Sequence, residues 1–201
     1  AENFKHAGRN VSIVEGAAQV MMPFDYDIAQ LLHKEIIDNG IALHVNSVVR
    51  EITDHSVIAV RNGQTVELPA DAVVLSIGVA QNTGLAVDAG LEIGEYRGIR
   101  VNHNYQTSDP DIYAVGDAIE TYDRLGHHYG SFAQAGPAQR EARAAADHIC
   151  GLQHTNNGYI GTSCLRVFSM NAACTGMNER TAKKLGIPYD VAYVLHTDKV
   201  K

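Results

Sequence analysis

Residues 107–117 read TSDPDIYAVGD, a turn followed by a short apolar run and then a glycine next to a carboxylate. The Asp-Pro pair favours a turn, and the β-favouring run 112–115 predicts a short buried strand. Gly116 then falls at a strand end, where open α/β sheets bind ligands. A glycine lets a ligand approach the backbone, and an ionised Asp117 accepts hydrogen bonds from sugar-type hydroxyls. The stretch therefore predicts a cofactor-binding turn.

The chain before this turn alternates between helix and strand. Residues 1–7 have the pattern of a helix end closed by Gly8, and Val11–Glu15 follows as a strand. A helix is predicted from about residue 25 to 39, ended by Gly40, with a strand over 41–45 after it. The predicted core-facing stripe of that helix is Ile28, Leu31, Leu32 and Ile36.

A small antiparallel meander is predicted next, over residues 48–52, 57–61 and 65–68, with an Asn62-Gly63 hairpin turn. Asp71 to Ile77 is almost continuously apolar, which is typical of a strand buried on both faces of a parallel sheet.

Later segments continue the alternation. We predict a strand at 99–101, an alanine-rich helix at 136–150, a short helix after Asn178 that Gly186 and Pro188 stop, and a strand at 189–196. The alanine-rich helix is expected to pack through a stripe of Ala138, Ala142, Ala145 and Ile149.

Glu15 ends its strand directly after a helix and a glycine. This order is typical of the second half of a dinucleotide-binding βαβ unit, whose acidic residue bonds the adenosine ribose hydroxyls. A carboxylate there favours NADH over NADPH because it repels the 2′-phosphate. The glycine fingerprint usually lies about 20 residues earlier, so we expect it upstream of Ala1, on an N-terminally truncated chain. The alternative is an ordinary solvated carboxylate at a strand end.

Composition excludes some function classes. The 201 residues are 45% hydrophobic and 19% charged, which indicates a globular chain. The net charge is −7 without a Lys/Arg run, so a nucleic-acid partner is not expected. No apolar stretch approaches a membrane span, and we expect a soluble cytoplasmic protein.

The cysteines and histidines show no ligand or redox spacing. Cys150, Cys164 and Cys174 form neither a Cys-x-x-Cys pair nor a zinc pattern, so we expect reduced, buried thiols. The ten histidines are scattered apart from His127-His128, and no metal site is expected.

The stretch at 107–117 resembles the second flavin-contact motif of the FAD-dependent pyridine nucleotide-disulfide oxidoreductases. Residues 76–83, SIGVAQNT, are similar to the family's pattern at the close of its NAD domain, and AGPAQR at 135–140 resembles its flavin-facing helix. Residues 161–180 resemble the opening of its dimerisation domain. The likeness covers essentially the whole chain, and its closest branch is that of coenzyme A-disulfide reductase, NADH oxidase and NADH peroxidase.

The resemblance implies an α/β fold with partial Rossmann-like NAD- and FAD-binding domains and the start of an α+β dimerisation domain. The implied domains are residues 1–84, 85–155 and 156–201. Asp117 would hold the ribityl chain of FAD, Gln134 and Ala135 would face the flavin pyrimidine, and Gly78 would let the chain pass near the nicotinamide. Gln81, Gln134 and Ala142 depart from the residues often found at these positions in the family.

The resemblance also implies hydride transfer from NADH through FAD to a cysteine-based centre that reduces a disulfide, a persulfide, a peroxide or O2. The redox cysteine of that branch belongs to a segment upstream of this chain, so no catalytic residue is expected within it. We expect the chain alone to be inactive and the intact protein to be a homodimer. Two alternatives stay open: a ferredoxin- or rubredoxin-type reductase, and a non-catalytic nucleotide-binding module.

Overall fold

The computed structural model describes residues 1–153, 156, 158–194 and 196, and these residues group into two units. One unit combines Ala1–Val48 with Leu165–Lys201, and the other is Val49–Cys164. These units do not follow the boundaries at 84/85 and 155/156 expected for the family's domains, and that three-part division stays a prediction.

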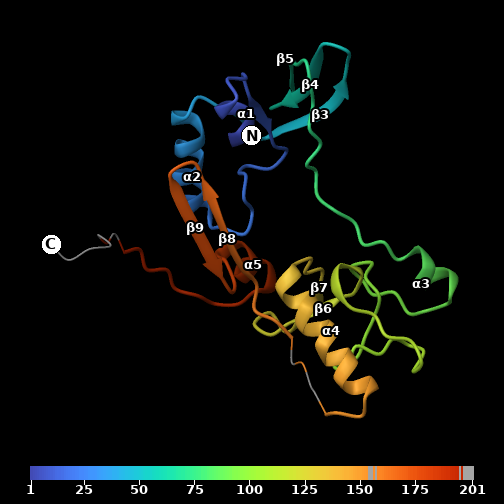
Figure 1. The fold of residues 1–201 in the computed structure, drawn as a ribbon. Helices are drawn as coiled ribbons and strands as arrows, with labels where there is room; N and C mark the ends of the chain where they lie inside the picture. Colours follow the sequence, from blue (N-terminus) through green and yellow to red (C-terminus); the bar gives the residue numbers. More distant parts are fainter. Residues whose placement is uncertain (154–155, 157, 195, 197–201) are drawn as a thin grey trace. The chain divides into compact units, whose positions relative to one another are not determined.

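The first unit is built on a parallel βαβ arrangement (Figure 1). Strands β1 and β2 pair in parallel, with Ile13 opposite Leu43, and the helix α2 connects them. The bounds are α1 Glu2–His6, β1 Ser12–Val14, α2 Tyr26–Asp38 and β2 Ala42–His44. The helix–glycine–strand order predicted for the start of the chain is confirmed, with Gly8 at φ +76°.

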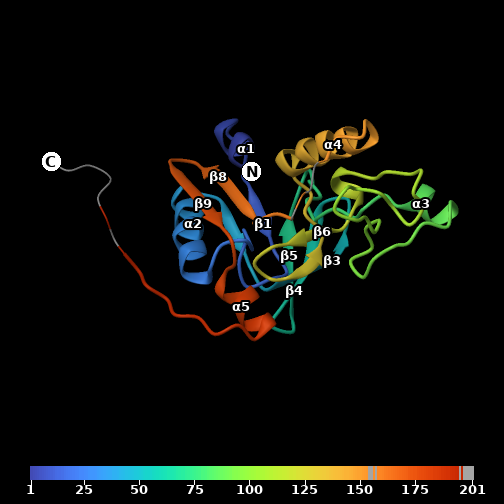
Figure 2. The ribbon, with the colours of Figure 1, turned by 90° about the horizontal axis from the view of Figure 1, so that it is seen from below.

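A hairpin from the far end of the chain completes this unit. Its strands are β8 Thr162–Val167, which enters this unit at Leu165, and β9 Met170–Thr175, and the helix α5 Glu179–Leu185 follows them. Figures 1 and 2 both show β9 beside α2. Buried side chains from α2 and from the hairpin form one core with Phe24 and Ile41; its other members are Leu32, Ile36, Val167 and Phe168.

Polar contacts tie the same two stretches together. Glu35 on α2 accepts hydrogen bonds from the backbone N–H of Ser169 at 2.9 Å and from its hydroxyl at 2.7 Å. The N-cap of α5 is Asn178, whose side chain accepts from the backbone N–H of Thr181 at 2.9 Å. The predicted cap and the predicted stop at Gly186, which has φ +67°, are confirmed.

The α2 stripe was predicted only in part correctly. Leu32 and Ile36 are buried, together with Ala29 and His33, but Ile28 and Leu31 are exposed. The buried face is therefore rotated from the predicted one. The reason is that the hairpin and β2 cover a narrow face of the helix, so two of the four apolar residues lie outside it.

The second unit begins with a three-stranded antiparallel meander, as predicted. Its strands are β3 Ser47–Ile52, β4 Ser56–Arg61 and β5 Gln64–Pro69. Asn62 and Gly63 both have positive φ, 51° and 77°, which matches the twist of a tight two-residue hairpin.

The remaining elements of this unit surround the stretch at 107–117. They are α3 Gly84–Asp88, the 3-10 turn η1 Gly116–Ala118, β6 Thr121–Asp123, β7 His128–Gly130 and α4 Ala135–Ile149. A second core lies between α4 and the chain that leads into η1, and its buried members are Ala86, Ile99, Tyr105, Ile119, Ala144 and Ala145.

Several predicted strands are absent as strands. Residues 71–77 are extended but pair with no other strand of the described chain, and they are exposed. The runs at 99–101 and 112–115 make only isolated bridges, from Ile99 to Ile93 and to Ile119 and from Tyr113 to Gln106. Residues 189–194 have no regular structure, and residue 195 lies outside the described residues. A strand needs a partner for its backbone, and periodicity alone does not supply one.

The stripe on α4 was also wrong in detail. Ala145 is buried, but Ala142 and Ile149 are exposed, and Glu141 and Ala144 are buried instead. The prediction counted apolar residues and could not anticipate a carboxyl group on the covered face.

Candidate functional site

The turn at Gly116 presents Asp117 to the outside. Val115 is extended, with φ −143° and ψ 164°, and Gly116 then takes φ +77°, a left-handed conformation that favours glycine. The 3-10 turn closes with the Ile119 N–H donating to the Gly116 carbonyl at 3.2 Å. Asp117 is exposed, and its carboxylate has no hydrogen bond within the described part of the chain. The Asp117 carboxylate is therefore free to accept hydrogen bonds from the hydroxyl groups of a ligand.

The start of α4 lies against the same turn. A Cβ added to Gly116 would lie 3.6 Å from the Cβ of Ala138, an ordinary contact, so the positive φ rather than lack of space calls for glycine. Gln134 is the N-cap residue, and its side-chain amide donates to the Thr162 carbonyl at 3.1 Å. The N–H groups of Ala135 and Gly136, both exposed, have no acceptor in the first helical turn. The helix start therefore offers partial positive charge to a ligand.

Glu15 lies in the first unit, at the carboxyl end of β1. Its side chain accepts a hydrogen bond from the backbone N–H of Ala17 at 2.8 Å, and its own N–H donates to the His44 carbonyl at 2.8 Å. The carboxyl group is half-buried and held in place by this local turn. The placement is that of a strand-end acid, as the sequence predicted.

Gly78 stands in the extended, exposed segment that follows the meander. It has φ +99°, and nothing lies within 4 Å of where a Cβ would be. The chain conformation itself calls for glycine there. Gly116, Asp117, Gln134 and Ala135 come together in one unit, whereas Glu15 belongs to the other.

Two buried polar groups were missed from the sequence. Glu141 on α4 is 1% exposed, and its Oε2 accepts the Gly116 N–H at 2.7 Å. Burial raises the pKa of Glu141, and the nearby charge of Asp117 adds to the rise, while the Gly116 N–H opposes it. The signal that could have shown this residue is its position within an alanine-rich helix face, four residues after Pro137.

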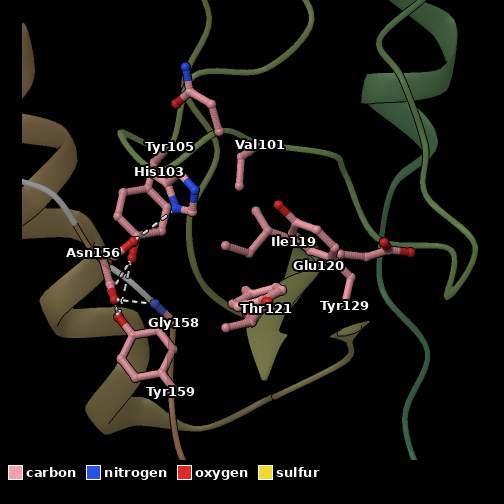
Figure 3. Close-up of a pocket in the computed structure, with 12 residues that line it drawn as sticks. Val101, His103, Tyr105, Ile119, Glu120, Thr121, Tyr129, Asn156, Gly158 and Tyr159 are labelled. Carbon is pink, nitrogen blue, oxygen red and sulfur yellow. Dashed lines mark hydrogen bonds between the residues drawn. The ribbon is translucent and has the colours of Figure 1, made fainter. Parts of the chain in front are cut away.

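The second missed group is a tyrosine pair in a pocket of the same unit (Figure 3). The hydroxyls of Tyr105 and Tyr159 lie 3.2 Å apart, and the amide of Asn156 donates to both. The Tyr159 hydroxyl donates to the Pro137 carbonyl at 3.4 Å, in the first turn of α4. Burial, followed by the hydrogen bond to Tyr159, raises the pKa of Tyr105 well above its usual range, so the Tyr105 phenol stays neutral. None of the predicted cofactor residues lines this pocket.

An ion pair between a partly exposed arginine and a buried glutamate lies at the edge of that pocket. Glu120 is buried, and Arg100 reaches its carboxylate at 3.2 Å while its guanidinium stacks 4.3 Å from the Tyr129 ring centre. A Cβ on Gly94 would come within 2.1 Å of the Glu120 carboxylate, so this glycine is needed for space. Glu120 also accepts a hydrogen bond from the Tyr96 N–H, so the pair holds the loop at 93–99.

The thiols differ from the prediction. All three cysteines are free, but Cys150 and Cys164 are exposed, and Cys174 is only half-buried, at the edge of the first core. The apolar neighbours in sequence did not translate into burial because β8 and the end of α4 turn these side chains outward. Among the described residues no group of three or more metal-ligating side chains comes together.

Comparison with known proteins shows the family. The model of the pyridine nucleotide-disulphide oxidoreductases matches residues 1–142, and the chain belongs to this family of oxidoreductases. The NADH oxidase of Streptococcus pyogenes serotype M6 is 27% identical over 202 residues, which cover 100% of this chain and 44% of that protein. The chain thus spans less than half the length of this relative.

Two solved structures share the fold over most of the chain. Reduced Bacillus anthracis CoADR-RHD is 38% identical, with a TM-score of 0.88 over 94% of this chain and 34% of that one. The NAD-dependent persulfide reductase from A. fulgidus is 30% identical, with a TM-score of 0.87 over 92% of this chain and 35% of that one. The predicted α/β class and the Rossmann-type relationship are confirmed.

The residues present fit the flavin that the family binds. The site combines an unengaged Asp117 carboxylate, which can accept hydrogen bonds from ribityl hydroxyls, with the free N–H groups at the start of α4, which can donate to an electron-rich ring edge. No helix in the described part of the chain is both long and apolar enough to cross a membrane.

Proposed function

We propose that the protein carrying this chain is an FAD-dependent oxidoreductase that takes hydride from NADH and reduces a small-molecule disulfide, a persulfide, a peroxide or O2. The observation that carries this proposal is the contact between η1 and α4, which brings the Asp117 carboxylate and the helix start together in one unit. Bound FAD supplies the hydride-accepting and electron-passing chemistry.

The roles of the chain's own residues follow from their positions. Asp117 orients the ribityl chain by accepting hydrogen bonds from its hydroxyl groups. The start of α4, with Gln134 and Ala135, stabilises negative charge at the pyrimidine edge of the flavin. Glu15 binds the adenosine ribose of NADH and disfavours the 2′-phosphate of NADPH. Gly78 leaves the backbone open beside the nicotinamide.

In this proposal Cys150, Cys164 and Cys174 take no part in electron transfer, and the reactive thiol belongs to another part of the intact protein. For Cys150 the supporting observation is its position at the C-terminal end of α4, the end opposite to the proposed flavin contact. We further infer a cytoplasmic homodimer, on the likeness of residues 161–180 to the family's dimerisation domain and on the absence of disulfides among the described cysteines.

The test is an anaerobic titration of the full-length protein with NADH and then NADPH, following the visible flavin spectrum. Bleaching at a lower concentration of NADH than of NADPH is the expected result. A colourless protein that cannot be reconstituted with FAD would overturn the proposal and favour a non-catalytic nucleotide-binding module.

A variant pair tests the flavin contact directly. Asp117→Ala removes charged hydrogen bonds of roughly 1.5–3 kcal/mol, so FAD affinity should fall about ten- to hundredfold. The matched control is Asp111→Ala, an exposed carboxylate in the loop before the turn, which should keep its flavin. Equal retention of FAD by both variants would exclude Asp117 from the site.

A further inference from the structure

Glu141 is an expensive residue to bury. A carboxyl group taken out of water costs several kcal/mol, roughly, unless it finds hydrogen-bond partners. Its helical neighbours on the covered face, Ala144 and Ala145, fill the same core with small apolar groups at no such cost. A buried polar group retained on an otherwise apolar face is expected to have a positional or functional role.

The partner of Glu141 shows what it positions. Its Oε2 accepts the Gly116 N–H at 2.7 Å, on the residue immediately before Asp117. This bond fixes the peptide group between Val115 and Gly116, and it does so at the point where φ changes to +77°. The direction in which the Asp117 side chain leaves the backbone therefore depends on the bond.

Glu141 also belongs to the helix whose first turn is expected to meet the flavin. It lies one helical turn after Pro137, and the Pro137 carbonyl is held by the buried Tyr159 hydroxyl at 3.4 Å. Two buried polar contacts thus fix the start of α4: one reaches the Gly116 turn and the other reaches the tyrosine pair.

We propose that Glu141 is a positioning residue of the flavin site. Its hydrogen bond from the Gly116 N–H fixes Asp117 and the start of α4 relative to each other, in the positions that bind the cofactor. This inference rests on the proposed FAD-dependent function. Its chemistry requires an acceptor atom that reaches Gly116 from α4, and it requires no negative charge.

Three variants of the full-length protein test whether the role of Glu141 depends on the length of its side chain or on its negative charge. Glu141→Gln keeps an acceptor at the same distance and should retain FAD with an affinity close to that of the wild type. Glu141→Leu removes the acceptor and leaves the Gly116 N–H unsatisfied, so the dissociation constant for FAD should rise about tenfold. Glu141→Asp keeps the carboxyl group but is one methylene shorter, so it should also lose affinity for FAD. If the leucine variant does not fold, the aspartate variant is compared with the glutamine variant instead.

The control is Tyr113→Phe. The Tyr113 hydroxyl bonds Nδ1 of His148 at 2.7 Å and so joins the same two segments at the far end of α4. Its loss should leave FAD affinity unchanged. The readouts are flavin content after gel filtration, the dissociation constant for FAD, and the flavin visible circular dichroism, which reports how the ring is held.

The ranking of the variants by their affinity for FAD tests the inference. Retention by glutamine with loss by aspartate and leucine supports the inference. Retention by all three, loss by glutamine with retention by aspartate, or an equal loss in Tyr113→Phe overturns it. If the wild-type protein itself binds no FAD, the proposed function has failed rather than the role of Glu141.

Discussion

At the scale of single residues, Glu15 gives the sharpest test of cofactor choice. Glu15→Gln keeps an acceptor for the Ala17 N–H, so the turn after β1 should survive. Without the negative charge, the ratio of the KM for NADPH to the KM for NADH should fall by about tenfold, or ~1.4 kcal/mol. Steady-state kinetics of the full-length protein with both cofactors measures this ratio.

Glu51→Gln is the control for that change, because it removes an exposed carboxylate of β3 with the same change in net charge. A ratio that moves equally in both variants, or in neither, would contradict a ribose-binding role for Glu15.

The buried carboxyl of Glu141 predicts a pH dependence of stability. Burial is the main cause that raises its pKa in the folded protein above the ordinary value of 4.5, and Asp117 adds to it. The unfolded chain therefore releases this proton at a lower pH than the folded chain, so the wild type loses stability as the pH rises through that interval. Glutamine does not titrate, so Glu141→Gln should gain stability relative to the wild type between about pH 4 and about pH 7.

Denaturant unfolding of the two apoproteins at both pH values measures this difference. A difference in unfolding free energy that stays constant across the interval would show that Glu141 titrates no differently in the folded and unfolded chains.

At the scale of elements, α2 shows where a helix is held. Leu32 is 1% exposed in the core shared with the β8–β9 hairpin, whereas the adjacent Leu31 is 51% exposed. Leu32→Ala should lower the free energy of unfolding by about 2–5 kcal/mol, because it leaves a cavity. Leu31→Ala is the matched control and should change it by no more than about 0.5 kcal/mol. Urea unfolding measures both changes in the free energy of unfolding. An equal loss in the two variants would contradict the packing of α2 described above.

The same helix shows how far an element can be predicted. Its extent, from the N-cap at Asp25 to the C-cap at Asn39, follows from local signals and was predicted within a residue. Its buried face was not, because Ile28 and Leu31 are apolar in sequence but lie beyond the surface that the hairpin covers. The hairpin comes from more than 120 residues later along the chain, roughly, and periodicity within a helix carries no information about it.

At the scale of the whole molecule, the extended segment after the meander exposes several large apolar side chains. Val74 is 70% exposed and Ile77 is 89% exposed. Contiguous apolar surface of this kind drives association in water. We expect the 201-residue chain by itself to self-associate, and the double variant Val74→Lys, Ile77→Lys to do so less. Sedimentation velocity over a range of concentrations measures this, and a monomeric wild-type chain throughout would contradict it.

Local chemistry in the sequence was enough to determine the family, the α/β class, the hairpin at Asn62-Gly63 and the position of Gly116-Asp117, because turns, caps and positive-φ glycines depend on neighbouring residues. Only the tertiary structure decided that 71–77 has no strand partner in the described chain, that Cys150 and Cys164 are exposed, and that Glu141 reaches Gly116 from 25 residues away. These features depend on which segments far apart in the sequence contact each other. The burial of a side chain is set by those contacts and not by its neighbours in sequence.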